Sequence, residues 1–268
     1  MDWNKTKTIF IIVFSILNVF LFSLYLNRYN EDLGVKVLSS VAPIEDRLLL
    51  DNITIPKIEN TIKDASYVSG NVHMFTSEEL DTLRNQKVDL KNGYIVKGIF
   101  DEPLEITKEN TVEKILKENI LRSDSYKLWE VDEDSNTATF FQKVNGRLVY
   151  FNQNAKVTLY WNDENEVVRY EQTILDNLED YKESKKLLPQ LQAIEVLHNS
   201  ALLKPNAKVK AIELGYSTLV QLTETQVFAP TWKVQVELED SALEEYFVNA
   251  VEGRIIEIPT EVEQASLR

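Results

Sequence analysis

Few side chains in this chain could act as a nucleophile, a general base or a soft metal ligand. The 268 residues include no cysteine, and the histidines are His73 and His198 alone. Without cysteine there are no disulfides, thiolate metal sites or cysteine nucleophiles. A serine hydrolase would need one of these histidines beside a serine, and no G-x-S-x-G sequence is present. The sequence also lacks H-E-x-x-H, an EF-hand loop and a glycine-rich phosphate loop.

Acidic residues are more numerous, with 43 Asp and Glu in all. Asp132–Asp134 and Asp163–Glu164 could attract calcium, although acidic turns between strands are usually just solvated. With so many carboxylates, a glycosidase that uses a pair of them is an alternative that the sequence does not exclude. Because the sequence does not show a full set of the residues that a catalytic site needs, we predict that the protein is not an enzyme. We expect no catalytic residue, cofactor, metal ion or small-molecule substrate.

The charge balance argues against a nucleic-acid partner. The 29 Lys and Arg are outnumbered by the acidic residues, and the formal net charge is −14 at pH 7. Binding to phosphate backbones needs clustered basic side chains, which this composition does not favour. Hydrophobic residues make up 44 % of the chain, an ordinary globular value.

The strongest local pattern lies at the N-terminus, from Ile9 to Leu26. These eighteen residues contain no charge, proline or glycine. As a helix they would extend roughly 27 Å, close to the thickness of a bilayer core. A cleaved signal peptide usually has a shorter apolar region that ends in small residues, whereas this run ends in Tyr25-Leu26-Asn27-Arg28. We therefore predict an uncleaved transmembrane helix.

The charges beside this segment predict its orientation. Lys5 and Lys7 precede the helix, while Arg28 is soon followed by two acidic residues. The positive-inside preference then places the N-terminus in the cytoplasm. We expect a single-pass protein of the cell membrane, with a cytoplasmic stub (1–8), a transmembrane helix (9–26), a tether (27–52) and two extracytoplasmic domains (53–178 and 187–262).

Four side chains of this helix are expected to share one face. Ser15, Asn18, Phe22 and Tyr25 are spaced by three or four residues. An asparagine in hydrocarbon can lower its cost by hydrogen bonding to another helix, and an amide can also be tolerated without such a partner. Tyr25 also fits an interfacial anchor. We predict that this face contacts partner helices.

The segment after the tether begins with a strand and a capped helix. Ala42-Pro43 disfavours helix within the tether. Residues 67–75 are predicted as a strand, and Thr76-Ser77-Glu78-Glu79 has the capping-box pattern that opens a helix. Residues 93–100 are predicted as a further strand.

The rest of the chain resembles two repeats of one helix followed by strands. The helices are predicted at 111–121 and 187–202, each with an apolar stripe. The first is followed by strands at 127–131, 137–144, 147–151 and 156–161, and the second by strands at 208–214, 218–222, 231–238 and 245–251. Each repeat ends in a hairpin, with turns at 162–165 and 252–253. Charged residues 176–186 are predicted as a linker or a solvated helix.

These patterns predict the α+β class, with a single N-terminal transmembrane helix followed by two similar helix-plus-antiparallel-sheet units. Alternation at 232–238 predicts that Trp232, Val234, Val236 and Leu238 point inward, with Lys233, Gln235 and Glu237 in water. Several aromatic residues are predicted to belong to the core rather than to a binding surface: Trp129, Phe140, Phe141, Tyr160 and Trp161.

The N-terminal run MDWNKTKTIFI resembles the start of the YycI (WalI) family, in which W-x-x-T-K-T-x-F-I enters one membrane helix. The match is carried by Trp3, Lys5, Thr6, Lys7, Thr8, Phe10 and Ile11. The two α+β units are similar to those of YycI and the related YycH. The ending V-N-A-x-x-G-x-I, at residues 248–255, separately resembles PepSY-like modules.

The resemblance implies an accessory protein of the Gram-positive WalK–WalR (YycG–YycF) two-component system, which controls cell-wall metabolism. Its partners would be YycH (WalH) and the sensor histidine kinase WalK (YycG), contacted through membrane helices and exterior domains. Such proteins restrain or stimulate the kinase, and we expect restraint. The alternative is an exterior module, tethered for location only, that binds a wall fragment, a peptide or a secreted enzyme.

Overall fold

The computed structural model describes residues 7–8, 10–24, 42–58, 62–221 and 225–257. The chain divides into two compact units, Met1–Asp51 and Asn52–Arg268. The expected two domains at 53–178 and 187–262 both lie within the second unit, and their boundaries stay a prediction.

The first unit contains two helical segments among its described residues. Residues 10–24 are helical, and their side chains are exposed. Within the described ranges, no helix is both long and apolar enough to cross a membrane. The second segment is α2, Ile44–Leu50, which begins directly after Pro43. The sequence did not predict this short helix, and the bounds of the tether stay a prediction. Proline disfavours the helical conformation for the residue before it, but its own fixed φ suits the position where a helix begins. Glu45 and Asp46 lie in the first turn, where their negative charges stabilise the helix because they face the positive end of its dipole.

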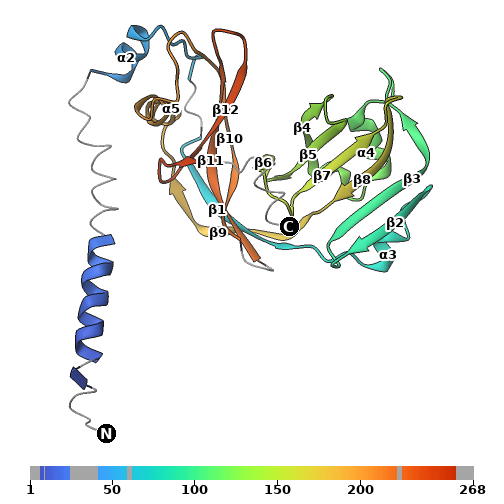
Figure 1. The fold of residues 1–268 in the computed structure, drawn as a ribbon, viewed down its shortest axis with the longest axis horizontal. Helices are drawn as coiled ribbons and strands as arrows, with labels where there is room; N and C mark the ends of the chain where they lie inside the picture. Colours follow the sequence, from blue (N-terminus) through green and yellow to red (C-terminus); the bar gives the residue numbers. More distant parts are fainter. Residues whose placement is uncertain (1–6, 9, 25–41, 59–61, 222–224, 258–268) are drawn as a thin grey trace. The chain divides into compact units, whose positions relative to one another are not determined.

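The second unit is mostly sheet with few helices (Figure 1). Its described elements are β1 (Asp64–Val72), α3 (Ser77–Leu80), β2 (Gln86–Lys91), β3 (Ile95–Glu105), α4 (Val112–Asn119), the 3-10 turn η2 (Ser123–Ser125), β4 (Tyr126–Asp132), β5 (Thr137–Val144), β6 (Arg147–Tyr150), β7 (Lys156–Trp161), β8 (Glu166–Gln172), β9 (Leu175–Lys186), α5 (Gln190–Asn199), β10 (Lys208–Gln221), β11 (Thr225–Glu237), β12 (Leu243–Asn249) and β13 (Ile255–Ile256). The composition is mixed α and β, in keeping with the predicted class.

Two groups of strands are joined into one hydrogen-bonded network. The first group has the order β4-β5-β7-β8-β3-β2, with antiparallel neighbours throughout. In the second group, β11 pairs with β10 along one edge and with both β12 and β1 along the other. β6 connects the groups, because it pairs with β5 and runs parallel to β10. β1, from the first expected domain, is thus hydrogen-bonded to β11 of the second.

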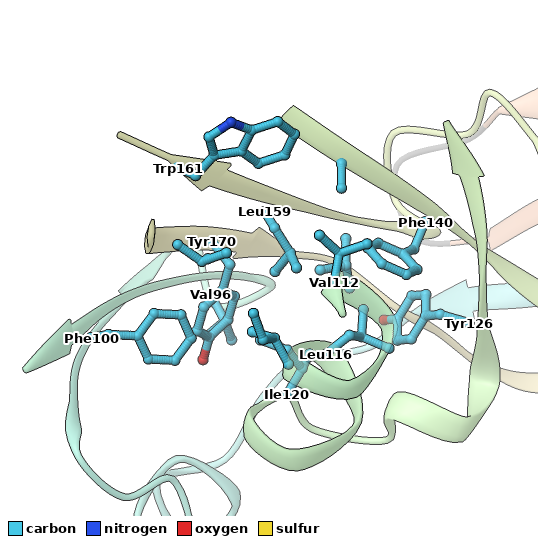
Figure 2. Packing of buried hydrophobic residues seen from close by; sticks show 14 of the residues in the cluster. Val96, Phe100, Val112, Leu116, Ile120, Tyr126, Phe140, Leu159, Trp161 and Tyr170 are labelled. Carbon is cyan, nitrogen blue, oxygen red and sulfur yellow. The ribbon is translucent and has the colours of Figure 1, made fainter. Parts of the chain in front are cut away.

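Helix α4 closes the core of the first group of strands (Figure 2). Thr111 caps the helix by accepting a hydrogen bond from the Lys114 N–H, and the helix buries Val112, Ile115 and Leu116. These side chains join an apolar cluster from the facing strands that includes Phe140, Leu159 and Tyr170. The amphipathic pattern of the sequence therefore identified both the helix and its buried face.

Helix α5 lies against β11 and β12 and buries Ala193, Ile194 and Leu197. Trp232 of β11 is 2 % exposed, and its indole Nε1 donates to the Leu188 carbonyl at 2.8 Å. This bond fixes the segment that leads into α5. Burial of Trp232, Val234 and Val236 confirms this part of the predicted inward face, while Leu238, Gln235 and Glu237 are half-buried.

Three other expectations are corrected by the strands. Residues 176–186 form most of β9 rather than a linker or helix. The two strands expected at 208–214 and 218–222 are the single strand β10. Lys233, expected in water, is buried. The strand β2 was not predicted.

Candidate functional site

Four ionisable side chains from separate segments meet where β1 and β9 adjoin the first group of strands. The ionic cluster consists of His73, which follows β1; Glu79 of α3; Arg122, between α4 and η2; and Asp176, near the start of β9. The local fold holds each in place. The His73 N–H donates to the Ile174 carbonyl, Glu79 completes the capping box with Thr76, and Arg122 occupies the left-handed region at φ 50°.

Each ring nitrogen of His73 faces a carboxylate. Nδ1 lies 3.1 Å from Asp176 Oδ2, and Nε2 lies 3.0 Å from Glu79 Oε2. The Arg122 guanidinium donates to Glu79 Oε1 at 2.9 Å and lies 3.4 Å from Asp176 Oδ2. The imidazole edge packs against the Phe75 ring at a centroid distance of 4.9 Å. With both nitrogens engaged, His73 is arranged to link segments rather than to take a proton from a substrate.

Both carboxylates of the ionic cluster are stabilised in their charged forms. Burial disfavours ionisation of Glu79, but hydrogen bonds from the Thr76 N–H, His73 and Arg122 outweigh it and lower the pKa of this carboxyl. The Asn177 backbone N–H, the largest influence, lowers the pKa of Asp176, and Arg122 adds to the effect. A carboxyl whose pKa is lower in the folded than in the unfolded state stabilises the fold above its unfolded-state pKa.

We expect Glu79→Gln to make the unfolding free energy less sensitive to acid. At pH 6 the variant should lose about 1 kcal/mol, because the charges of a part-exposed cluster are screened by water. This difference should shrink as the pH falls through the folded-state pKa of Glu79, where the natural carboxylate is also neutralised. Urea unfolding at pH 6 and pH 3 measures it. Glutamine can retain the capping box, so a lost helix cap does not explain the result.

Glu133→Gln is the matched control, because it removes one negative charge from an exposed turn. It should leave the unfolding free energy within about 0.5 kcal/mol of the natural chain at both pH values. If Glu79→Gln retained the full difference at pH 3, the stabilising role of the Glu79 charge would be contradicted.

A second cluster links the two groups of strands through aromatic rings. The aromatic cluster comprises Trp129, Phe141, Tyr150, Phe151 and Phe247, with ring-centroid distances of 5.1 to 6.4 Å. Lys233 Nζ lies 4.7 Å from the Trp129 ring centroid and pairs with Glu213 at 3.2 Å and Glu245 at 3.5 Å. These three side chains cover Lys233, which explains why it is buried although it alternates with apolar residues along the strand. Phe140, Phe141 and Trp161 are also buried as predicted, while Trp129 and Tyr160 are half-buried.

The remaining candidate residues are placed apart from these clusters. His198 lies near the end of α5. Asp132 Oδ1 accepts from the backbone N–H groups of Asp134 and Ser135, so the first acidic cluster forms a turn. The second acidic cluster also forms a turn, in which Asn162 Oδ1 accepts hydrogen bonds from the backbone N–H groups of Glu164 and Glu166. Among the described residues, no group of three His, Asp or Glu is arranged to hold a metal ion.

Only part of the predicted partner face and family motif can be placed. Ser15, Asn18 and Phe22 lie in the helical residues 10–24, and Lys7 and Thr8 are also helical. Trp3, Lys5, Thr6 and Tyr25 lie outside the described residues, as do the limits of the expected span at Ile9 and Leu26. The partner face therefore stays a prediction. The ionic cluster was missed because sequence spacing gave no sign of it; the scarcity of histidine was the one available signal.

One known protein family matches most of the chain. A family model described as YycI protein matches residues 35–251. The chain belongs to the YycI family. YycI proteins are regulatory accessory proteins associated with the WalK/YycG two-component system. The match excludes the N-terminal run that suggested the family, so the folded residues of this YycI-family chain support the same assignment independently.

Two solved structures resemble this YycI-family chain at low identity. An uncharacterized protein from Eubacterium rectale ATCC 33656 gives a TM-score of 0.44 at 12 % identity, covering 78 % of this chain and 92 % of that one. The Bacillus megaterium YpeB C-terminal domain gives 0.39 at 14 % identity, covering 72 % and 90 %. No curated protein matches the chain.

Proposed function

We propose that this protein is a membrane-anchored, extracytoplasmic regulator of the sensor histidine kinase WalK (YycG). It acts together with YycH, through its N-terminal helix and its exterior domains, and restrains signalling that controls cell-wall metabolism. The observation that carries the proposal is the YycI family match over residues 35–251, because this family is associated with the WalK/YycG system. The proposal involves no catalysis, cofactor or small-molecule substrate.

The N-terminal helix supports membrane anchoring. Its apolar side chains are exposed: Phe10, Ile11 and Val19 are 66–71 % exposed. Burying such surface in an apolar medium is favourable by about 25 cal/mol per Å². Lys5 and Lys7 precede the apolar run, which favours a cytoplasmic N-terminus. The proposed span, 9–26, extends beyond the helical residues described.

The same helix offers a route to the kinase. In the proposed topology, contacts of this helix and of the exterior domains carry information to the kinase. A helix changes the balance between two kinase states only if it binds them with different free energies. A difference of about 1–3 kcal/mol shifts that balance roughly 5–150-fold. A few contacts between membrane helices can supply this free energy.

We expect Asn18→Leu to reduce the amount of WalK and YycH that co-purifies with the full chain from membranes. Loss of one interhelical hydrogen bond costs about 0.6–1 kcal/mol, so recovery should fall about threefold to fivefold. Quantitative mass spectrometry of the purified complex measures it. Leucine preserves the apolar character of the helix, so anchoring is retained.

Ser23→Leu is the control, because it removes a polar group away from the face formed by Ser15, Asn18 and Phe22. It should leave recovery of both partners unchanged. Equal recovery with Asn18→Leu and the natural chain would exclude Asn18 from the interface.

A further inference from the structure

The His73 ring faces more hydrogen-bond acceptors than a neutral imidazole can satisfy. Its Nδ1 lies 3.1 Å from Asp176 Oδ2, and its Nε2 lies 3.1 and 3.0 Å from the two carboxylate oxygens of Glu79. A neutral imidazole has one N–H donor and one lone pair, whereas the imidazolium has a donor on each nitrogen. Only the imidazolium can donate to both carboxylates, because in either neutral form a ring lone pair faces a carboxylate oxygen.

The charges around the ring favour the same form. In the described part of the chain, the charged groups that face the ring are Asp176 of β9, Glu79 of α3 and Arg122, which lies between α4 and η2. The pKa of each carboxyl is lowered, so both are charged near neutral pH. Arg122 Nη2 lies 3.4 Å from Nε2, farther than the Glu79 oxygens, and its charge opposes protonation. Two carboxylates and one guanidinium still leave a net negative charge, which the imidazolium neutralises.

These contacts lie at the boundary between two hydrophobic cores. Ile174 belongs to the core of the first group of strands, whereas the next residue, Leu175, belongs to a second core together with Phe228 of β11. The His73 backbone N–H donates to the Ile174 carbonyl, and Asp176 directly follows Leu175, so both ends of this contact are fixed at the boundary. The ring therefore ties the start of β9 to α3 of the first group.

We propose that His73 is a proton-dependent clamp at the boundary between the two cores. In its imidazolium form it holds Glu79 and Asp176 at once, and loss of one proton turns one of these contacts into a repulsion. The folded state then binds more protons than the unfolded state, so the free energy of unfolding falls as the pH rises through the range in which histidine titrates, about pH 5–8. This acid-dependent clamp goes beyond the proposed kinase contact and does not depend on it.

Urea unfolding of the full chain in a nonionic detergent, at pH 5.5 and at pH 8, tests the clamp. Histidine is the side chain that ordinarily titrates between these values, and the chain has only His73 and His198. The unfolding equilibrium constant of the natural chain should be about fivefold larger at pH 8, the effect of one charged hydrogen bond in a part-exposed cluster. His73→Gln should lose this pH dependence, because an amide does not titrate. His198→Gln is the matched control and should retain it.

Asp176→Asn keeps His73 and removes the need for its second proton. The amide of this variant can donate to Nδ1, while its oxygen still accepts from the Asn177 backbone N–H. A neutral ring then donates to Glu79 and accepts from the amide, so the fivefold pH dependence should disappear. A merely structural role of His73 would leave the pH dependence unchanged.

NMR of the histidine ring nitrogens in the folded and the urea-unfolded natural chain counts the ring protons without a substitution at the clamp, and His198→Gln assigns the signals. At one pH, the ratio of doubly to singly protonated His73 should be about fivefold higher in the folded chain. Stability that does not fall between pH 5.5 and pH 8, an unchanged pH dependence in His73→Gln or Asp176→Asn, or equal proton ratios in the two states would each overturn the proposal.

Discussion

Trp232→Ala lowers the free energy of unfolding by about 3–5 kcal/mol, the range for truncating a large aromatic side chain in a core. Trp232 is almost fully buried in β11, where it lies between Leu214 of β10 and Val248 of β12 in the strand register. Its removal leaves a cavity that these strands cannot close. It also deprives the Leu188 carbonyl of the indole N–H that holds the entry to α5.

Urea unfolding monitored by circular dichroism measures this loss. Leu219→Ala is the control, because Leu219 is 46 % exposed on β10 and should change stability by less than about 0.5 kcal/mol. Equal small effects from both variants would contradict the place given to Trp232 in the core.

Elements with a regular apolar pattern could be predicted from the sequence. β5 and β7 have the predicted bounds, and the apolar residues Ala138, Phe140, Val157 and Leu159 that mark the pattern are buried. The capping box at Thr76 forms as expected, because its pattern depends only on residues within four positions of one another. α4 follows for the same local reason.

Elements without a regular apolar pattern could not be predicted from the sequence. β9 is stabilised by backbone pairing with β1 while most of its side chains stay in water, so its sequence has the composition of a linker. β10 was predicted as two strands, 208–214 and 218–222. Gly215 lies between them, and in the fold glycine is needed there because a Cβ would clash with the Tyr150 ring.

The ionic cluster was beyond reach for a different reason. His73 and Asp176 are 103 positions apart, and Arg122 is 43 positions from Glu79. They meet because β1 and β9 pair, which is a long-range property of the topology. Lys233 is similar, because the alternation predicted that it lies in water, whereas Trp129 of β4 and the carboxylates of Glu213 and Glu245 lie against it in the fold.

Replacing residues 9–26 by an unrelated apolar helix of equal length tests the central claim, that this helix carries the regulation of WalK. The replacement retains an anchor and leaves residues 27–268 unchanged, so it separates tethering from side-chain recognition. A coupling of about 1–3 kcal/mol would be removed, changing the kinase state balance roughly 5–150-fold.

The measurement is the output of a WalK-dependent promoter in cells that carry either chain at equal membrane abundance. Because we propose restraint, the replaced helix should raise output to the level seen in cells that lack the protein. A chain with the natural helix should keep output low. Full regulation by the replaced helix would contradict the account and would favour an exterior module that is tethered only for its location.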